Sequence, residues 1–144
     1  MKTYSAVWRV SGPDFPLDAF KARFPSFELD AEHRRGDPKR KGGVYEVSGF
    51  NALICEAQSA GELVAEVRRA LAEEQLLFLW VKDLATSNGI DVGVFYDVDE
   101  PEPSSASASL SWALSDLSEL VRLGLGLETS FYPCSSGSEL EGAQ

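Results

Sequence analysis

Charged side chains are the residues of this sequence with the most potential for chemistry, and the basic ones are concentrated in one segment. Residues 33–41 read HRRGDPKRK and contain five of the thirteen Lys and Arg: Arg34, Arg35, Lys39, Arg40 and Lys41. Outside this segment eight basic residues face 22 acidic ones, and the whole chain has a formal net charge of −10. Three interpretations of the basic segment stay open: a solvated loop that balances the acidic body, a contact for a partner protein, or a binding site for phosphate or nucleic acid.

The acidic residues favour a basic protein as partner. From Asp83 to the last residue the chain has eleven acidic residues and a single basic one, Arg122. A field of this sign repels nucleic acid and anionic membranes, and it attracts and steers basic partners. The carboxylates that we expect to form the partner-binding surface follow: Asp91, Asp97, Asp99, Glu100, Glu102 and Glu128.

Residues that could perform catalysis are few. His33 is the only histidine, and it lies among cations that oppose its protonation. Cys55 and Cys134 fit no nucleophile, zinc or redox motif. The acidic turn lacks the Asp-x-Asp-x-Asp-Gly spacing of a calcium loop, and no nucleotide-binding or zinc-peptidase motif is present. We therefore predict no catalytic residues, no cofactor and no metal, and we favour a protein that is not an enzyme.

The chain has the size and composition of one globular domain. It has 144 residues, 44% of them hydrophobic and 25% charged, which is typical of a single domain with its own core. We predict this domain at residues 1–133 and a mobile tail rich in Ser, Gly and Glu at 134–144. No signal peptide is recognisable, and the longest apolar run has six residues. The expected location is therefore cytoplasmic, with no contact to membranes.

Apolar periodicity positions these charges on a fold of mixed type. Alternating residues predict strands at 4–10, 44–47, 90–98, 106–110 and 125–132, with a further brief strand possible at 52–55. Helical spacing predicts helices at 15–24, 59–71, 75–87 and 115–123. The first of the two middle helices begins at a capping-box pattern, Ser59 to Glu62, and the second ends at Asn88-Gly89. Residues 76–81 could instead form a buried strand.

The resulting order, β-α-β-(β)-α-α-β-β-α-β, is typical of an α+β fold. Strands interspersed with short helices and a hairpin predict a mostly antiparallel sheet with helices packed on one face. The pattern leaves open whether Trp8, Trp80 and Trp112 lie in the core or are exposed as interface anchors.

Several short motifs together resemble a bacterial family known as domain of unknown function 4279. They are the Val10-Ser11-Gly12 turn before a helix, the Gly36-Asp37-Pro38 loop, the Leu123-Gly124 helix exit and a last strand that ends in Phe131-Tyr132. The resemblance covers about residues 3–133. One departure from the family's pattern lies after the basic segment, where the aromatic residue is Tyr45 in a Gly-Gly-Val-Tyr context. It implies an α+β fold and brings no catalytic residues. Its relatives are similar to small accessory proteins found near bacterial toxins, which implies an immunity or antitoxin role.

The sequence thus predicts a binding protein without enzymatic activity. In its sharpest form this is an immunity-type protein that neutralises a basic toxin through its acidic surface. The alternative is a small enzyme or ligand-binding domain that grips an anionic metabolite with residues 34–41.

Overall fold

Five strands form a single mixed sheet. The computed structural model describes residues 2–99 and 109–135, and its strands are β1 (Lys2–Gly12), β2 (Ala31–His33), β3 (Ser48–Ala57), β4 (Ser87–Asp97) and β5 (Gly126–Cys134). Their order across the sheet is β2-β3-β1-β4-β5. Three of the pairings are antiparallel, and β4 and β5 pair in parallel. The predicted α+β class with a mostly antiparallel sheet is therefore confirmed.

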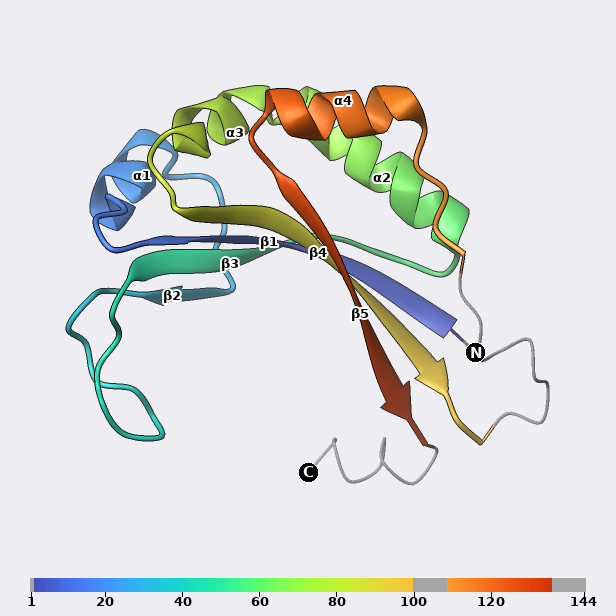
Figure 1. Ribbon diagram of the computed structural model, residues 1–144, viewed down its shortest axis with the longest axis horizontal. Helices are drawn as coiled ribbons and strands as arrows, with labels where there is room; N and C mark the ends of the chain where they lie inside the picture. The colour runs from blue at the N-terminus through green and yellow to red at the C-terminus, as the bar shows by residue number, and fades with distance from the viewer. Residues whose placement is uncertain (1, 100–108, 136–144) are drawn as a thin grey trace.

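Helices cover only one face of this sheet. They are α1 (Leu17–Arg23), α2 (Ala60–Glu73), α3 (Gln75–Lys82) and α4 (Leu114–Arg122), and Figure 1 shows all four on the same side of the strands. Side chains alternate between the two faces of a strand, so every second side chain of each long strand packs under the helices and the others face outward. We call the uncovered side the open face.

The core lies between the helices and the sheet, and Trp8 is at its centre. Its side chain is completely buried, and its ring contacts the rings of Phe50 at 5.1 Å and Phe78 at 4.5 Å between centroids. The indole Nε1 donates a 2.8 Å hydrogen bond to Oδ1 of Asn88. Trp80 and Trp112 are partly buried and pack against this core, so none of the three tryptophans is a fully exposed anchor.

The predicted helix at 75–87 is shorter in the structure, and the prediction for its end is wrong. Helix α3 stops at Lys82, which settles residues 76–81 as helical, and β4 already begins at Ser87. Gly89 does not adopt a left-handed conformation. A Cβ on it would lie 3.0 Å from the carbonyl oxygen of Gly126, so this glycine permits the close approach of β4 and β5. The other predicted stop is confirmed, because Gly124 has φ of +71° and follows Leu123, the C-cap of α4.

Two further predicted strands are not formed among the described residues. Residues 44–47 form no strand, and Val44 makes only an isolated bridge to Pro38. The predicted strand at 106–110 lies outside the described residues except for Ser109 and Leu110, which are in no strand. Among the residues that the structure describes, β4 pairs with β1 and β5 rather than with a returning hairpin strand.

Two other predicted segments have different bounds from the elements of the structure. The possible strand at 52–55 is part of the longer strand β3. The predicted tail falls outside the described residues apart from Cys134, the last residue of β5, and Ser135.

Candidate functional site

A buried carboxylate lies at the centre of the open face. Asp91 is only 7% exposed, and its Oδ2 accepts a hydrogen bond of 3.2 Å from Nε of Arg9 on β1. Its Oδ1 accepts a hydrogen bond of 3.0 Å from the hydroxyl of Ser130 on β5. Burial of a carboxylate is costly unless it is paired and hydrogen-bonded, and here both conditions are met. Asp91 therefore acts mainly by fixing Arg9 and Ser130 in place.

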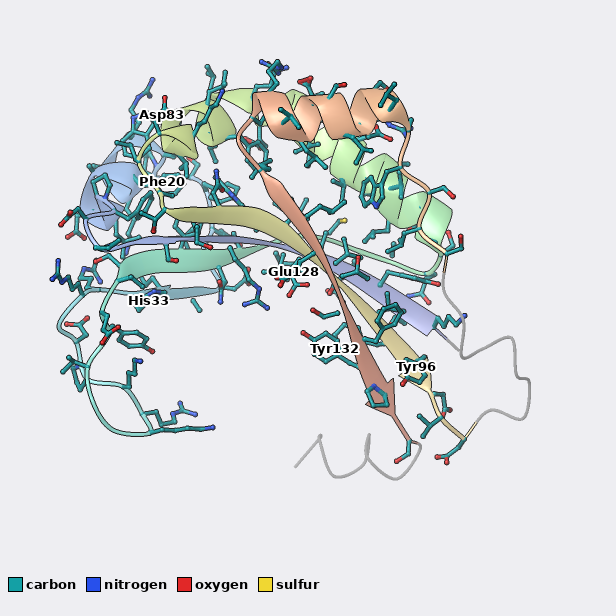
Figure 2. All side chains as sticks on the ribbon, viewed as in Figure 1. Phe20, His33, Asp83, Tyr96, Glu128 and Tyr132 are labelled. Carbon is teal, nitrogen blue, oxygen red and sulfur yellow. The ribbon has the colours of Figure 1, made fainter. Side chains whose placement is uncertain are left out.

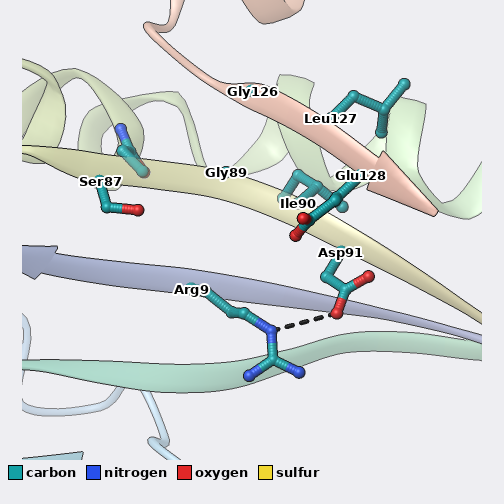
Figure 3. A pocket seen from close by; sticks show the side chains of 9 residues that line it. Arg9, Ser87, Gly89, Ile90, Asp91, Gly126, Leu127 and Glu128 are labelled. Carbon is teal, nitrogen blue, oxygen red and sulfur yellow. Dashed lines mark hydrogen bonds and ion pairs between the residues drawn. The ribbon is translucent and has the colours of Figure 1, made fainter. Parts of the chain in front are cut away.

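Glu128 stands beside this pair and is exposed. The parallel register makes Glu128 the neighbour of Asp91 across β4 and β5, and Figure 3 shows its carboxylate next to the ion pair of Arg9 and Asp91. These residues line a shallow cavity of about 310 Å³, together with Gly89 and Gly126 at the start of the two strands. The two glycines keep the floor of the cavity open, since neither has a side chain to fill it.

An aromatic pair continues the same face toward the end of β4 and β5. The rings of Phe95 and Tyr132 stack with centroids 4.8 Å apart and an angle of 18° between their planes. They lie over Gly93, because a Cβ there would meet Phe95 Cε2 at 3.1 Å and Tyr132 Cε2 at 3.3 Å. Tyr132 remains 39% exposed, and it lies on the open face like Glu128 (Figure 2). The chain thus presents a partly exposed aromatic surface next to carboxylates.

The charge of the open face is negative. Asp97 follows Phe95 at the next outward position of β4, and the register of β3 places the exposed Glu56 opposite Ser5 on the same face. With Asp91 and Glu128, four carboxylates share this face with the guanidinium of Arg9. The predicted acidic residues Asp91, Asp97 and Glu128 are therefore brought together, and Asp99, whose amide donates to Asp97 Oδ1 at 2.8 Å, lies just beyond. Glu100 and Glu102 lie outside the described residues.

Arg34 and Arg35 of the basic segment fold back onto acidic residues near α1. Arg34 donates hydrogen bonds to Asp18 at 2.5 Å and to Glu32 at 3.4 Å. Arg35 lies 3.7 Å from a carboxylate oxygen of Asp14. The hydrogen bond and the charge of Arg34 lower the pKa of the Asp18 carboxyl. These two arginines therefore balance the charge of the protein's own surface.

The remaining basic residues lie on an ordered hairpin that extends away from the helices (Figure 1). Backbone hydrogen bonds cross the hairpin from Gly36 to Tyr45 at 2.8 Å and from Lys39 to Gly43 at 2.9 Å. The ring of Tyr45 stacks on His33 at 4.7 Å, and Nζ of Lys39 lies 5.6 Å from the centre of the same ring. Arg40 and Lys41 are exposed and form no ion pair with any described residue. The basic segment is thus divided between internal pairing and solvent.

The residues considered for catalysis are not arranged for it. Partial burial and the charge of Lys39 lower the pKa of His33, while burial raises the pKa of the Cys55 thiol to about 11. A nucleophilic thiolate needs the opposite shift. Within residues 2–99 and 109–135, no group of three or more His, Cys, Asp or Glu side chains could hold a metal ion. No helix in the described part of the chain is long and apolar enough to cross a membrane.

Sequence reasoning missed Arg9, Phe95 and Tyr132 as members of this site. Alternation along β4 puts Phe95 and Asp97 on one face of this strand, but which strand lies beside it depends on long-range pairing. No protein-family model, no curated protein and no solved structure matches this chain. The resemblance to domain of unknown function 4279 stays a prediction.

Proposed function

We propose that this chain is a binding protein without enzymatic activity, whose open face recognises a cationic segment of a basic partner protein. The observation that carries the proposal is the aromatic pair Phe95–Tyr132, which lies between Glu128 and Asp97 on one face. A ring face attracts a cation through its quadrupole, and a carboxylate attracts it through its charge and as a hydrogen-bond acceptor. An arginine or lysine side chain satisfies both groups at once.

The charge of the whole chain supports the same class of partner. A net charge of −10 steers basic proteins toward the molecule and raises their association rate. The sharpest form of the proposal is an immunity-type protein that occupies the basic surface of a bacterial toxin. This form rests on the sequence resemblance as well as on the charge, and the open face supplies the contact surface.

The basic hairpin gives less support to an anion-binding function. Arg34 and Arg35 already contact Asp18 and Asp14, so they are not available to a ligand without breaking these contacts. Lys39, Arg40 and Lys41 remain, and all three are exposed on the hairpin. Exposed lysines and arginines on a loop hold an anion only weakly, because water screens their charge.

A titration with a defined cationic peptide tests the proposal. An acetylated and amidated octa-arginine peptide is added to the ¹⁵N-labelled chain at low salt, and an octa-glutamate peptide is the control. We expect shifts of the amide signals of β4 and β5 around Glu128 and Tyr132. Shifts confined to the helical face, or no binding of octa-arginine, would contradict the proposal.

Three variants locate the binding energy. Glu128→Gln removes one exposed charge, which is worth about 0.2–1 kcal/mol and so weakens binding by about 1.4- to 5-fold. Tyr132→Ala removes a cation–π contact of about 0.5–1 kcal/mol, or about 2- to 5-fold. Glu73→Gln, an exposed charge on α2, is the matched control and should leave the affinity unchanged. An equal loss in Glu128→Gln and Glu73→Gln would show that only net charge matters.

The same variants apply to a natural partner. The product of the gene next to this chain's own is co-expressed with it and tested for a stable complex at low and high salt. We expect a basic partner whose complex weakens with salt and is weakened further by Tyr132→Ala. A partner that binds equally well to the Tyr132→Ala variant would refute a role for the open face.

A further inference from the structure

The two edges of the sheet are protected very differently. At one edge, β2 has three residues, and its Glu32 is engaged by Lys21 at 2.9 Å and by Arg34 at 3.4 Å. At the other edge, β5 has nine residues and one charged side chain, Glu128. Among the described residues β5 pairs only with β4, so its outer row of backbone groups is unpaired there. Proteins usually shorten, charge or cover such an edge, since it invites another strand.

An apolar stripe on α4 runs along the same side of the molecule. Leu114, Leu117 and Val121 are 80%, 40% and 76% exposed, respectively. Their spacing of three and four residues places them on one side of the helix. Figure 1 shows α4 and β5 together at the front, ahead of α2 and β4.

Contacts of α4 establish which way this stripe faces. Arg122 donates to the side chain of Gln75 at 2.8 Å, and Asp116 receives two hydrogen bonds from Arg68 of α2. The side of α4 that carries Arg122 therefore faces α2 and α3. Successive helix residues are turned by about 100°, so Leu117 and Val121 lie more than a quarter turn from Arg122 and Leu114 nearly a quarter turn from it. The stripe therefore faces away from α2 and α3, toward the outer edge of the sheet above β5.

The helix-side residues of β5 are apolar as well. Leu127 and Phe131 are the register neighbours of the buried Ile90 and Val94, so their side chains are on the helix-covered side. Phe131 is nevertheless 54% exposed. The β5 edge therefore combines unpaired backbone groups, apolar side chains on the helix-covered side of the strand and an apolar stripe on α4. A second molecule that bound there would extend both the sheet and the helix layer.

We propose that two copies of this chain form a symmetric dimer through antiparallel pairing of β5 with the β5 strand of the second copy, centred on Thr129. In this register Leu127 lies opposite the partner's Phe131 and Glu128 lies opposite the partner's Ser130. Residues directly opposite each other point to the same side of a sheet, so the helices of both copies lie on one side. The two α4 stripes then meet across the axis.

The strand sequence itself selects a second copy as the occupant. Leu127 and Phe131 are equidistant from Thr129, so one pairing satisfies both apolar residues in both copies. Pro133, which has no N–H to donate, falls beyond the central pairs. A shift of the register by one residue would place helix-side residues opposite open-face residues and turn the second copy over. The interface is nearly uncharged, so a partner selected by charge has little to recognise there.

The dimer is separate from the proposed function, because it leaves the open face uncovered. The two also respond oppositely to salt. A complex with a basic partner weakens as salt rises, whereas salt screens the repulsion between two copies of charge −10. Failure of one proposal is therefore distinguishable from failure of the other.

Sedimentation velocity on the full chain, at low and high salt and over a range of concentrations, provides the first test. We expect a monomer–dimer equilibrium that shifts toward dimer as salt rises. The double variant Leu114→Glu/Val121→Glu should weaken dimerisation at least about tenfold, since it places charges in the apolar interface. Leu76→Glu, at a 71% exposed position of α3, is the control and should dimerise like the wild type. A chain that stays monomeric throughout, or a double variant that dimerises normally, would overturn the proposal.

A cysteine cross-link tests the register. Directly opposite Cα atoms in an antiparallel pair are about 4.5–5.5 Å apart, which is within the range of a disulfide. Thr129→Cys should therefore form a covalent dimer on mild oxidation, seen on a non-reducing gel. Ala65→Cys, an exposed position on α2, measures the background from Cys55 and Cys134. Cross-linking of Thr129→Cys at the background level would contradict the Thr129-centred register.

Discussion

Replacing Asn88 by alanine should destabilise the fold well beyond the effect of an ordinary surface change. The Oδ1 of Asn88 accepts the hydrogen bond from the indole Nε1 of Trp8, and its Nδ2 donates to the carbonyl oxygen of Gly124 at 3.3 Å. Asn88 thereby connects the central strand β1, the start of β4 and the turn between α4 and β5. Alanine removes both contacts and leaves the Nε1 donor of a fully buried ring without a partner.

The expected cost follows from that unpaired donor. A buried polar group left unsatisfied costs about 1–3 kcal/mol, so we expect a fall of about 2 kcal/mol in the free energy of unfolding. For a chain of this size that corresponds to a fall of about 4–8 °C in Tm. Urea unfolding followed by circular dichroism measures the free energy, and thermal unfolding measures Tm. The slope of the urea dependence should not change.

A double-mutant cycle with Trp8→Phe separates this hydrogen bond from other effects. Phenylalanine has no donor, so Asn88→Ala should cost about 1 kcal/mol less in the Trp8→Phe background than in the wild type. The cavity created by the smaller ring is present on both sides of that comparison and cancels. An identical cost of Asn88→Ala in both backgrounds, or a cost below about 0.5 kcal/mol in the wild type, would refute the assignment.

Three further predictions address pH, backbone geometry and the open face. The hydrogen bonds from Arg68 lower the pKa of Asp116 below its ordinary value of 3.8; the carboxylate therefore stabilises the fold above that pH and loses this effect as pH falls through the lowered pKa. Thermal unfolding should show Asp116→Asn less stable than the wild type at neutral pH, with a difference that shrinks toward pH 2. Gly124→Ala should destabilise the fold by at least about 1 kcal/mol, because φ is +71° and a Cβ would lie 2.7 Å from a lysine side chain. Gly61→Ala has open space around the new Cβ and should stabilise the fold by about 0.4–1 kcal/mol. The opposite order of stabilities in urea unfolding would contradict this explanation. Gly93→Ala should tilt the aromatic pair above it, alter the near-ultraviolet circular dichroism and weaken octa-arginine binding by about 2- to 5-fold, and unchanged binding would count against the aromatic contact.

Local patterns in the sequence predicted where helices and strands lie better than they predicted which strands pair with each other. The Ser59 cap is formed as expected, since its Oγ accepts the amide of Glu62 at 3.1 Å. The Gly124 turn is likewise a local property of one residue. Gly89 was misassigned because Asn-Gly after a helix is an ordinary helix end, and only the neighbouring strand shows that the glycine is needed for close approach. The Asn-Gly pair did mark a position that needs glycine, but such a position has two possible physical causes: a left-handed helix end or the close approach of two strands.

The candidate site depends on contacts that no local pattern contains. Arg9 and Asp91 are 82 positions apart and meet only because β1 pairs with β4. Phe95 and Tyr132 meet because β4 and β5 are parallel neighbours. The division of the basic segment is also a tertiary effect, since Arg34 and Arg35 find their partners on and just before α1. Charge composition indicated the kind of partner, but the arrangement of the strands decided which residues could contact it.

The central position of β1 has a consequence for how the protein is made. Both neighbours of β1 follow it in the chain, β3 first and then β4. At a synthesis rate of about 5–20 residues per second, Arg9 leaves the ribosome about 4–16 s before Asp91, which is 82 positions later. During that interval one edge of β1 has no strand to pair with, and the indole Nε1 of Trp8 lacks Asn88, its native acceptor. The central strand of the sheet therefore cannot complete its native pairing until β4 has been synthesised.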